Sequence, residues 1–318
     1  MSDIDNQKTK YSVSVVVPFH NAEQTILQTL GTVYEALYKS NCIDEYEVIA
    51  VDDASTDSSH RLVSEQFPSV QVFSVNKRIY YLEAANKGMF RSRYDYVLLL
   101  TQGLFLPAGY FDDMMPHVAR ENVYMCSARL MGSGGQLSRR MLPVFGSGRI
   151  GMEPDVRDEG GASVMLQRGN LLMNREVMLS LGGYDTMFSA HKSADLELAL
   201  RGWSYGYKSI FVDSVLCQIV EPSASSQDWD KSNEKGQEEW NEILTHFYYL
   251  HGLSLVKYRL TMNFYFLLSL VVPLSLFQRT RWALCKYIGN YNSILNERMW
   301  KYGHPKFSLQ EIADYYFK

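Results

Sequence analysis

The sequence predicts an α/β fold in which a mixed, mostly parallel sheet is flanked by helices and followed by a helical C-terminal extension. Short β-branched runs that end at Pro or Asp alternate with segments whose apolar residues recur at helical spacing. The charge also changes along the chain. Residues 250–318 carry a net charge of +6, which leaves −10 for the first 249 residues of a chain whose total is −4. We therefore expect one domain over residues 11–220 and a basic, helical extension over residues 221–318.

The composition excludes several classes of protein. With 318 residues, 46% hydrophobic and 21% charged, the chain is neither disordered, collagenous nor a many-span membrane protein. The four cysteines form no CxxC pair, so neither a disulfide framework nor a zinc site is indicated. Residues 1–10 lack the apolar core of a secretory signal, and we expect a cytoplasmic protein. The acidic first part argues against nucleic-acid binding.

The first hundred residues predict alternating strands and helices. Each run of buried-type strand residues precedes a segment with helical periodicity, which is typical of parallel strands joined by crossover helices. The expected strands are residues 13–17, 47–51, 70–75 and 96–100, and the expected helices are residues 23–38, 58–66 and 82–90. Ligands of such a sheet bind at the carboxyl ends of its strands.

The middle of the chain predicts a long loop followed by regular structure. Residues 132–161 hold eight of the 21 glycines without sustained periodicity, so we expect a mobile surface loop there. A strand is expected at residues 170–173, and helices at residues 175–181 and 195–205. Residues 223–236 are polar and predict a linker.

The C-terminal part of the sequence predicts helices that lie either at a membrane surface or in the protein core. Residues 237–260 are helical and rich in aromatics, and residues 260–277 contain no charged residue but are flanked by Lys and Arg. This stretch is short for a membrane span. It fits either a buried helix pair or an interfacial segment held by cations, and the second alternative predicts a protein peripheral to the inner face of a membrane.

Two nucleotide-binding motifs are missing from the first turn. The residues after the first strand, Pro18 to Glu23, read PFHNAE, which is not the G-x-G-x-x-G of a dinucleotide-binding fold. No Walker loop occurs either. The sequence therefore supports neither a dinucleotide oxidoreductase nor a P-loop ATPase.

Several other motifs, in order, resemble the family 2 glycosyltransferases. They are VSVVVPFHN (13–21), VDDASTD (51–57), NKG (86–88), YVLLL (96–100), GGYD (182–185) and ADLELALRGWSYGY (194–207). The resemblance covers about residues 11–220 and implies a GT-A type fold that binds a nucleotide sugar. Several motifs in the right order are more specific than any one alone.

The resemblance implies a donor site at the first turns for a nucleotide sugar that carries uracil. Asp53 matches the carboxylate that accepts from the imide N–H of the base, which suits a charge-assisted hydrogen bond. His20 stands where the family usually has a stacking Tyr. The candidate donor-binding residues are Pro18, His20, Asn21, Asp53, Asn86, Lys87, Thr101, Gln102 and Gly103.

The resemblance also implies an acceptor site at the helix that begins near residue 195. Asp195 matches the catalytic base that deprotonates the acceptor hydroxyl for a single, inverting displacement. Glu197 and Trp203 are the candidate acceptor-binding residues. The alternatives are that Asp195 caps its helix and that Trp203 is a core aromatic.

The sequence departs from the family where a metal would bind. The family carries D-x-D after its fourth strand, where this chain has Thr101-Gln102-Gly103, so both carboxylates that would hold Mn²⁺ or Mg²⁺ are missing. We therefore predict no cofactor. The positive charge for a departing diphosphate would come from the available cations, Lys87, Arg139, Arg140, Arg149 and Arg168.

Two functions stay open from the sequence. The first is an inverting transferase that passes a sugar to a glycan or lipid-linked acceptor in polysaccharide biosynthesis. The second is a catalytically inactive pseudo-glycosyltransferase that binds a partner, such as another glycosyltransferase, because fold-level likeness does not establish activity.

Overall fold

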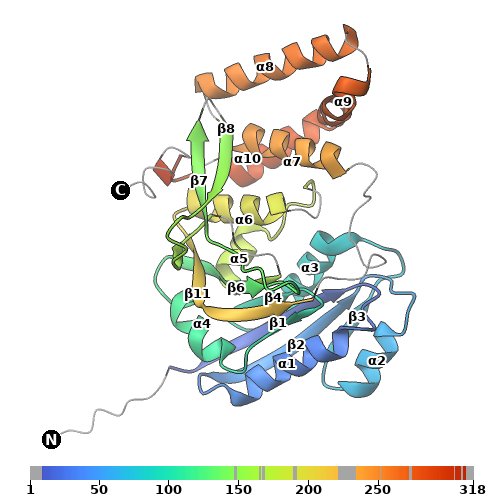
Figure 1. The fold of residues 1–318 in the computed structure, drawn as a ribbon, viewed down its shortest axis with the longest axis vertical. Coiled ribbons are helices and arrows are strands. Elements are labelled where there is room, and N and C mark those ends of the chain that lie inside the picture. Colours follow the sequence, from blue (N-terminus) through green and yellow to red (C-terminus); the bar gives the residue numbers. More distant parts are fainter. Residues whose placement is uncertain are drawn as a thin grey trace, which may run out of the picture.

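The fold is described from a computed structural model of the full chain (Figure 1). The described residues are 9–146, 149–164, 166, 169–188, 192–220, 234–250, 252–271, 274–303, 305–308 and 311–312. Most of the linker expected at residues 223–236 lies outside them.

The first hundred residues form the expected alternation of strands and helices. Every strand and helix predicted there is confirmed, with ends that differ by a few residues. The elements are β1 (Tyr11–Phe19), α1 (Ile26–Lys39), β2 (Ile43–Asp52), α2 (Ser59–Gln66), β3 (Gln71–Ser74), α3 (Tyr80–Arg91) and β4 (Tyr96–Leu100).

The second half of the sheet mixes parallel and antiparallel strands. Its elements are β5 (Leu104–Phe105), α4 (Tyr110–Val118), β6 (Val123–Met131), β9 (Gly161–Ala162), β10 (Asn170–Asn174), α5 (Arg175–Leu181), α6 (Lys192–Ser204) and β11 (Lys208–Ile219). The strand order is β3-β2-β1-β4-β10-β6-β11-β5, and β9 pairs with β11. Strands β3, β2, β1 and β4 are parallel, whereas β10 runs antiparallel to β4 and β6. The expected mixed, mostly parallel α/β sheet is confirmed.

Side chains that alternate along the strands build a core on each face of the sheet. Val13, Val15 and Val17 point into the core covered by α1, α2 and α4, and Val16 points into the core on the opposite face. This alternation follows from the two-residue period of a strand. Helix α3 lies close to the sheet on the second face, because a Cβ at Gly88 would come 2.3 Å from a methyl of Val16.

The loop expected over residues 132–161 is only partly a loop. It contains a hairpin of β7 (Met141–Gly146) and β8 (Arg149–Pro154), paired from Met141–Pro154 to Gly146–Arg149. The expectation was wrong because glycines dominate the composition of the segment and hide the short apolar run of β7, which reads MLPVFG. Figure 1 shows this hairpin extending from the sheet toward the C-terminal helices.

The C-terminal helices pack on the same face of the sheet as α3, α5 and α6. They are α7 (Glu234–Tyr249), α8 (Gly252–Val271), α9 (Leu274–Gly289) and α10 (Tyr291–Tyr302). Residues of α7, α9 and α10 belong to the same hydrophobic core as α3 and α6. The single helix expected over residues 237–260 is divided between α7 and α8, and the break lies near Leu250.

Helix α8 lies outermost in the fold (Figure 1). Several of its apolar side chains are exposed. Val256, Leu260, Phe264 and Leu267 are 52–63% exposed, and they recur at helical spacing. Among the residues that the structure describes, no helix combines the length and apolar character that crossing a bilayer requires. The exposed stripe agrees with the interfacial alternative better than with a buried helix pair.

Candidate functional site

The carboxyl ends of β1 and β2 lie side by side, because Phe19 pairs with Asp52 in the parallel ladder. Pro18 is buried in β1 opposite Val51. Asn21 has a φ of +47°, its amide N–H donates to Ser55 Oγ at 3.1 Å, and its side-chain oxygen accepts from Thr56 N at 2.8 Å. Asn21 therefore ties the first turn to the second through its own backbone and side chain.

Gln102 and His20 connect the end of β4 to the end of β1. The Gln102 side chain accepts from His20 N at 2.7 Å and donates to His20 O at 3.1 Å. His20 Nδ1 donates to the carbonyl of Asp53 at 2.7 Å, because a carbonyl can only accept. Both side chains are buried, with His20 9% exposed, so His20 presents little ring surface for stacking on a base.

Asp53 organises the start of α3. Its Oδ1 accepts from Ile79 N at 2.7 Å and its Oδ2 from Tyr80 N at 2.9 Å, and the carboxylate is buried. Arg78 Nε lies 3.8 Å from Oδ2, and the Arg78 guanidinium lies 5.2 Å from the ring centroid of Tyr80. Tyr80 itself has a φ of +65°, a left-handed conformation that costs energy for a residue with a Cβ. The carboxylate thus holds Arg78 and Tyr80 at the carboxyl edge of the sheet.

A chain of hydroxyl and ring contacts joins the end of β4 to the start of α6. Thr101 Oγ1 donates to the Tyr81 hydroxyl at 3.3 Å, and the rings of Tyr81 and Tyr184 lie 6.4 Å apart. Tyr184 in turn donates to Asp195 Oδ1 at 2.6 Å. The structure therefore brings Thr101 and Asp195, predicted for the donor and the acceptor side, into one cluster. Asp195 lies in the first turn of α6 and is 2% exposed.

Asn86 fixes the GGYD turn against α3. Its side chain donates to Tyr184 O at 2.9 Å and accepts from Tyr184 N at 2.8 Å. This two-way pairing positions the tyrosine that contacts Asp195. Lys87, the next residue, is half-exposed and lies 3.9 Å from Glu83 in the same helix.

Gly103 allows a close approach of two backbones. It has a φ of +79°, and a Cβ there would come 2.7 Å from the carbonyl oxygen of Val220. Its N–H donates to Thr29 Oγ1 at 3.0 Å. Gly103 shapes the end of β4 with its backbone alone.

Glu197 and Trp203, predicted to bind an acceptor, are buried on other faces of α6. Glu197 is 0% exposed, its Oε2 accepts from Arg201 at 2.8 Å, and its Oε1 accepts from the Tyr302 hydroxyl. Burial raises the pKa of Glu197, and the Arg201 guanidinium acts in the opposite direction. Trp203 is 5% exposed and donates to Ser209 Oγ at 2.9 Å. The structure does not bring these two side chains to a surface where a sugar could contact them.

The cations expected for a departing diphosphate are only partly available. Arg140 is buried in an ion pair with Asp155, which removes it from that role. The side chains of Arg149 and Arg168 lie outside the described residues, and Arg139 is exposed on the segment before β7. The sequence analysis missed Arg78, which the structure places beside Asp53.

Thr101 and Gln102, which the sequence analysis expects at the position of D-x-D, do not fit a divalent cation. Thr101 and Gln102 offer no carboxylate, and their polar atoms bond to Tyr81 and to the backbone of His20. Within the described part of the chain, no group of three or more His, Cys, Asp or Glu side chains could hold a metal ion.

Sequence reasoning also missed the three tyrosines of this edge, Tyr80, Tyr81 and Tyr184. Tyr184 lies within the GGYD motif, so its position carried a signal that was not used. Tyr80 and Tyr81 carried none, because the left-handed turn that presents them depends on contacts with Asp53. A single sequence does not show such a turn.

Comparisons with known proteins identify the family of the chain. Glycosyl transferase family 2 matches residues 14–181, more than half of the chain. EpsE of Bacillus subtilis (strain 168), which carries the name of a glycosyltransferase, is 22% identical over 223 residues, or 66% of this chain and 73% of EpsE.

Two solved glycosyltransferase structures share the fold. A mannosyltransferase from Pyrobaculum calidifontis in complex with GDP-Man and Mn²⁺ has a TM-score of 0.54 at 20% identity, covering 75% of this chain and 63% of its own. GalNAc-T7 with UDP, GalNAc and Mn²⁺ has a TM-score of 0.59 at 14% identity, covering 89% of this chain and 58% of its own. This chain thus spans less than two thirds of either structure's length. The expected GT-A type fold is confirmed, and the chain belongs to glycosyl transferase family 2, within the glycosyltransferase class of enzymes.

Proposed function

We propose that this chain transfers a sugar from a UDP-linked donor to a hydroxyl of a glycan or lipid-linked acceptor in polysaccharide biosynthesis. Family membership supports the reaction class. The observation that carries the proposal is the contact chain from Thr101 through Tyr81 and Tyr184 to Asp195, which joins the donor edge to the start of α6. The solved relatives bind GDP-Man in one case and UDP with GalNAc in the other.

The donor site of this proposal lies at the carboxyl ends of β1, β2 and β4. Asp53 recognises the base, and Arg78, which is 27% exposed, supplies positive charge at the same edge. Because both Asp53 oxygens accept backbone N–H groups, the carboxylate also fixes the turn that presents Arg78 and Tyr80. Lys87, which lies on α3, is a second cation of the proposed site.

Asp195 is the proposed general base. It takes the proton of the acceptor hydroxyl, and the resulting oxygen nucleophile attacks the anomeric carbon from the face opposite the diphosphate. The bond from the anomeric carbon to the diphosphate oxygen breaks, and the nucleoside diphosphate leaves with the electron pair. This single displacement inverts the anomeric centre. Since Asp195 is 2% exposed, acceptor binding has to open access to its carboxylate.

The test is transfer by the Asp195→Asn variant, measured as release of nucleoside diphosphate with a panel of UDP-sugars and hexose acceptors. We expect turnover to fall by about 10²- to 10⁴-fold, the usual range for loss of a general base, with unchanged nucleotide affinity. Asp213→Asn is the matched control, because Asp213 is exposed on β11. Equal turnover in the Asp195→Asn variant would remove the base assignment.

A second measurement tests the metal. Because Thr101 and Gly103 replace carboxylates, Mn²⁺ should change UDP affinity by less than about tenfold, or 1.4 kcal/mol. Calorimetric titration of UDP with Mn²⁺ and with EDTA measures this ratio. A larger ratio would mean that residues outside the described part complete a metal site.

The engagement of the donor-edge side chains favours a second candidate function, that of a catalytically inactive pseudo-glycosyltransferase that binds a partner. The polar side-chain atoms of Gln102 and Asp53 already form hydrogen bonds with backbone groups of the protein. In that case no acceptor produces turnover, and UDP-sugars leave the melting temperature unchanged, because a ligand that does not bind the folded state does not stabilise it. The protein would then act by binding a partner, such as another glycosyltransferase.

A location at the inner face of a membrane is also part of the proposal. The exposed apolar stripe of α8 would enter the interface, and cations such as Lys257 and Arg259 would contact an anionic leaflet. A lipid-linked acceptor would then reach the transferase from the membrane surface.

A further inference from the structure

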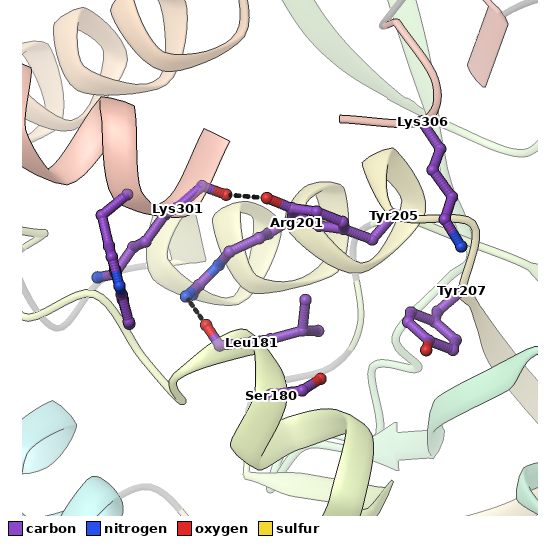
Figure 2. Close-up of a pocket in the computed structure, with 8 residues that line it drawn as sticks. Ser180, Leu181, Arg201, Tyr205, Tyr207, Lys301 and Lys306 are labelled. Atoms are coloured by element: carbon purple, nitrogen blue, oxygen red, sulfur yellow. Dashed lines mark hydrogen bonds between the residues drawn. The ribbon is translucent and has the colours of Figure 1, made fainter. Parts of the chain in front are cut away.

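A groove at the C-terminal end of α6 lies apart from the donor edge. Its volume is about 340 Å³, within the range of about 300–1,000 Å³ for ligand pockets. The lining residues are Ser180, Leu181, Arg201, Tyr205, Tyr207, Trp300, Lys301 and Lys306. Figure 2 shows Lys306 and Tyr207 on one side of the groove and Lys301 on the other, with Arg201 and Tyr205 between them. Asp195 lies in the first turn of α6, ten residues before Tyr205, or about 15 Å along the chain at a helical rise of 1.5 Å per residue.

The charge of the lining is positive. Arg201, Lys301 and Lys306 line the groove, and no Asp or Glu is among the lining residues that the structure describes. Acidic partners lie behind two of these cations: Glu197 pairs with Arg201, and Asp185 and Glu297 lie 3.4 and 3.1 Å from Lys301. Lys306 is exposed. Arg201 is 1% exposed, and its Nε has no hydrogen-bond partner within the described part of the chain, so the groove contains a buried donor that a ligand could satisfy.

The carbonyl groups at the nearby helix ends do not oppose an anion strongly, because protein donors satisfy them. Leu181 O at the end of α5 accepts from Arg201 at 2.5 Å. Ser204 O at the end of α6 accepts from the N–H groups of Lys306 and Phe307 at 2.7 and 3.0 Å. The negative end of each helix dipole is thus partly neutralised before a ligand arrives.

The aromatic side chains supply the other half of the recognition surface. Trp300 is 68% exposed, so its ring is accessible to a ligand. It packs over Gly182, where a Cβ would come 3.0 Å from the Trp300 ring, and Lys301 Nζ lies 5.8 Å from its ring centroid. Tyr207 packs edge-on against Tyr124 with ring centroids 6.3 Å apart, and the Tyr205 hydroxyl donates to Lys301 O at 2.8 Å. These contacts hold the two tyrosines in place.

From this combination we infer that the groove binds an acidic sugar chain, that is, a glycan with carboxylate-bearing residues. The apolar C–H face of a pyranose ring packs on an aromatic ring, whose face is negative. The carboxylate of the sugar pairs with the ammonium group of Lys306 and with the guanidinium group of Arg201. A neutral sugar would form no ion pair with the cations, and a small inorganic anion would not pack on the ring of Trp300. The inference does not depend on the proposed transfer reaction, because the groove lies at the opposite end of α6 from Asp195.

The experiment uses the full chain and trigalacturonate as the probe. Binding is measured by calorimetry at low ionic strength and by saturation-transfer NMR. The fully methyl-esterified trimer keeps the rings but removes the charges, and inorganic phosphate supplies an anion without a ring. We expect the free-acid trimer to bind at least about tenfold more tightly than its ester or phosphate.

Variants locate the binding. Trp300→Ala and Lys306→Gln should each weaken trigalacturonate binding by about tenfold. Met299→Ala, which changes an exposed neighbour of Trp300, and Lys39→Gln, which changes an exposed cation on α1, should not. Thermal melting checks that each variant stays folded, and UDP affinity should be unchanged in all four. The inference is overturned if the ester binds as well as the acid, if phosphate binds as well as the trimer, if Trp300→Ala has no effect, or if no binding is detected at millimolar concentration.

Discussion

Carboxylates are used in two different ways in two regions of this molecule. At the donor edge, Asp53 accepts from backbone N–H groups of Ile79 and Tyr80, and its charge shapes a turn. Between α6 and α10, Glu197 instead pairs with Arg201 and the Tyr302 hydroxyl in the core. The first arrangement presents residues to a ligand, and the second attaches the C-terminal helices to the sheet. Substitutions at the donor edge should therefore affect nucleotide binding, and substitutions at Glu197 should affect folding.

The largest effect is expected at Glu197. Glu197→Ala leaves Arg201, which is 1% exposed, as an uncompensated buried charge, and we expect the free energy of unfolding to fall by about 3–5 kcal/mol. Urea denaturation measures the loss. Glu65→Ala, which breaks an exposed pair with Arg61, is the control and should cost less than about 1 kcal/mol. If the two variants lose similar stability, Glu197 does not hold the helices together.

A smaller effect is expected at Asp53, and it should appear in two measurements. Asp53→Ala removes two charge-assisted hydrogen bonds, so the free energy of unfolding should fall by about 1.5–3 kcal/mol. UDP affinity, measured by calorimetry, should fall as well, because the turn that carries Arg78 and Tyr80 loosens. Unchanged affinity in a folded Asp53→Ala variant would remove Asp53 from the donor site.

These two regions also differ in how far the sequence predicts them. The turns after β1 and β2 could be predicted because Asn21 and Asp53 follow strands directly, in motifs shared with a family. Gln102 was expected to contact a donor, but its bonds to His20 bridge 82 positions of the chain, and no local pattern encodes such a pair. The same holds for Glu197, whose bond to Tyr302 spans 105 positions. A carboxylate at helical spacing looks the same in the sequence whether it faces an acceptor or a buried arginine.

A third carboxylate, Asp112 of α4, extends the comparison to pH. It accepts from Ser40 Oγ at 2.7 Å and from Asn41 N at 2.9 Å, so it belongs with the turn-shaping kind. Partial burial acts to raise the pKa of Asp112, but hydrogen bonds from Asn41, Ser40 and Cys42 outweigh it and hold the pKa well below the ordinary value.

The lowered pKa of Asp112 fixes the sign of the pH dependence. The stabilisation is present above the unfolded-state pKa of about 3.9 and is lost as the pH falls through the lower folded-state pKa. Asp112→Asn should therefore lower the free energy of unfolding by about 1–2 kcal/mol at pH 7, and the difference should shrink below about pH 4. Urea titrations between pH 3 and pH 7 measure it. A difference that stays constant with pH would mean that the carboxylate charge contributes nothing.

The smallest effect concerns α8, which uses neither kind of carboxylate contact. Leu260 is 63% exposed within the apolar stripe, so entry into a membrane interface would remove its surface from water. Leu260→Ser should weaken binding to anionic vesicles by about 1 kcal/mol, or about fivefold, and raising the salt concentration should weaken binding of both proteins. Tyr38→Ser on α1, where Tyr38 is 90% exposed, is the control and should bind as the unaltered chain does. Flotation with phosphatidylglycerol and phosphatidylcholine vesicles measures the partition. If the unaltered chain floats equally with both lipids, or with neither at low salt, the stripe contacts a protein partner instead of a membrane.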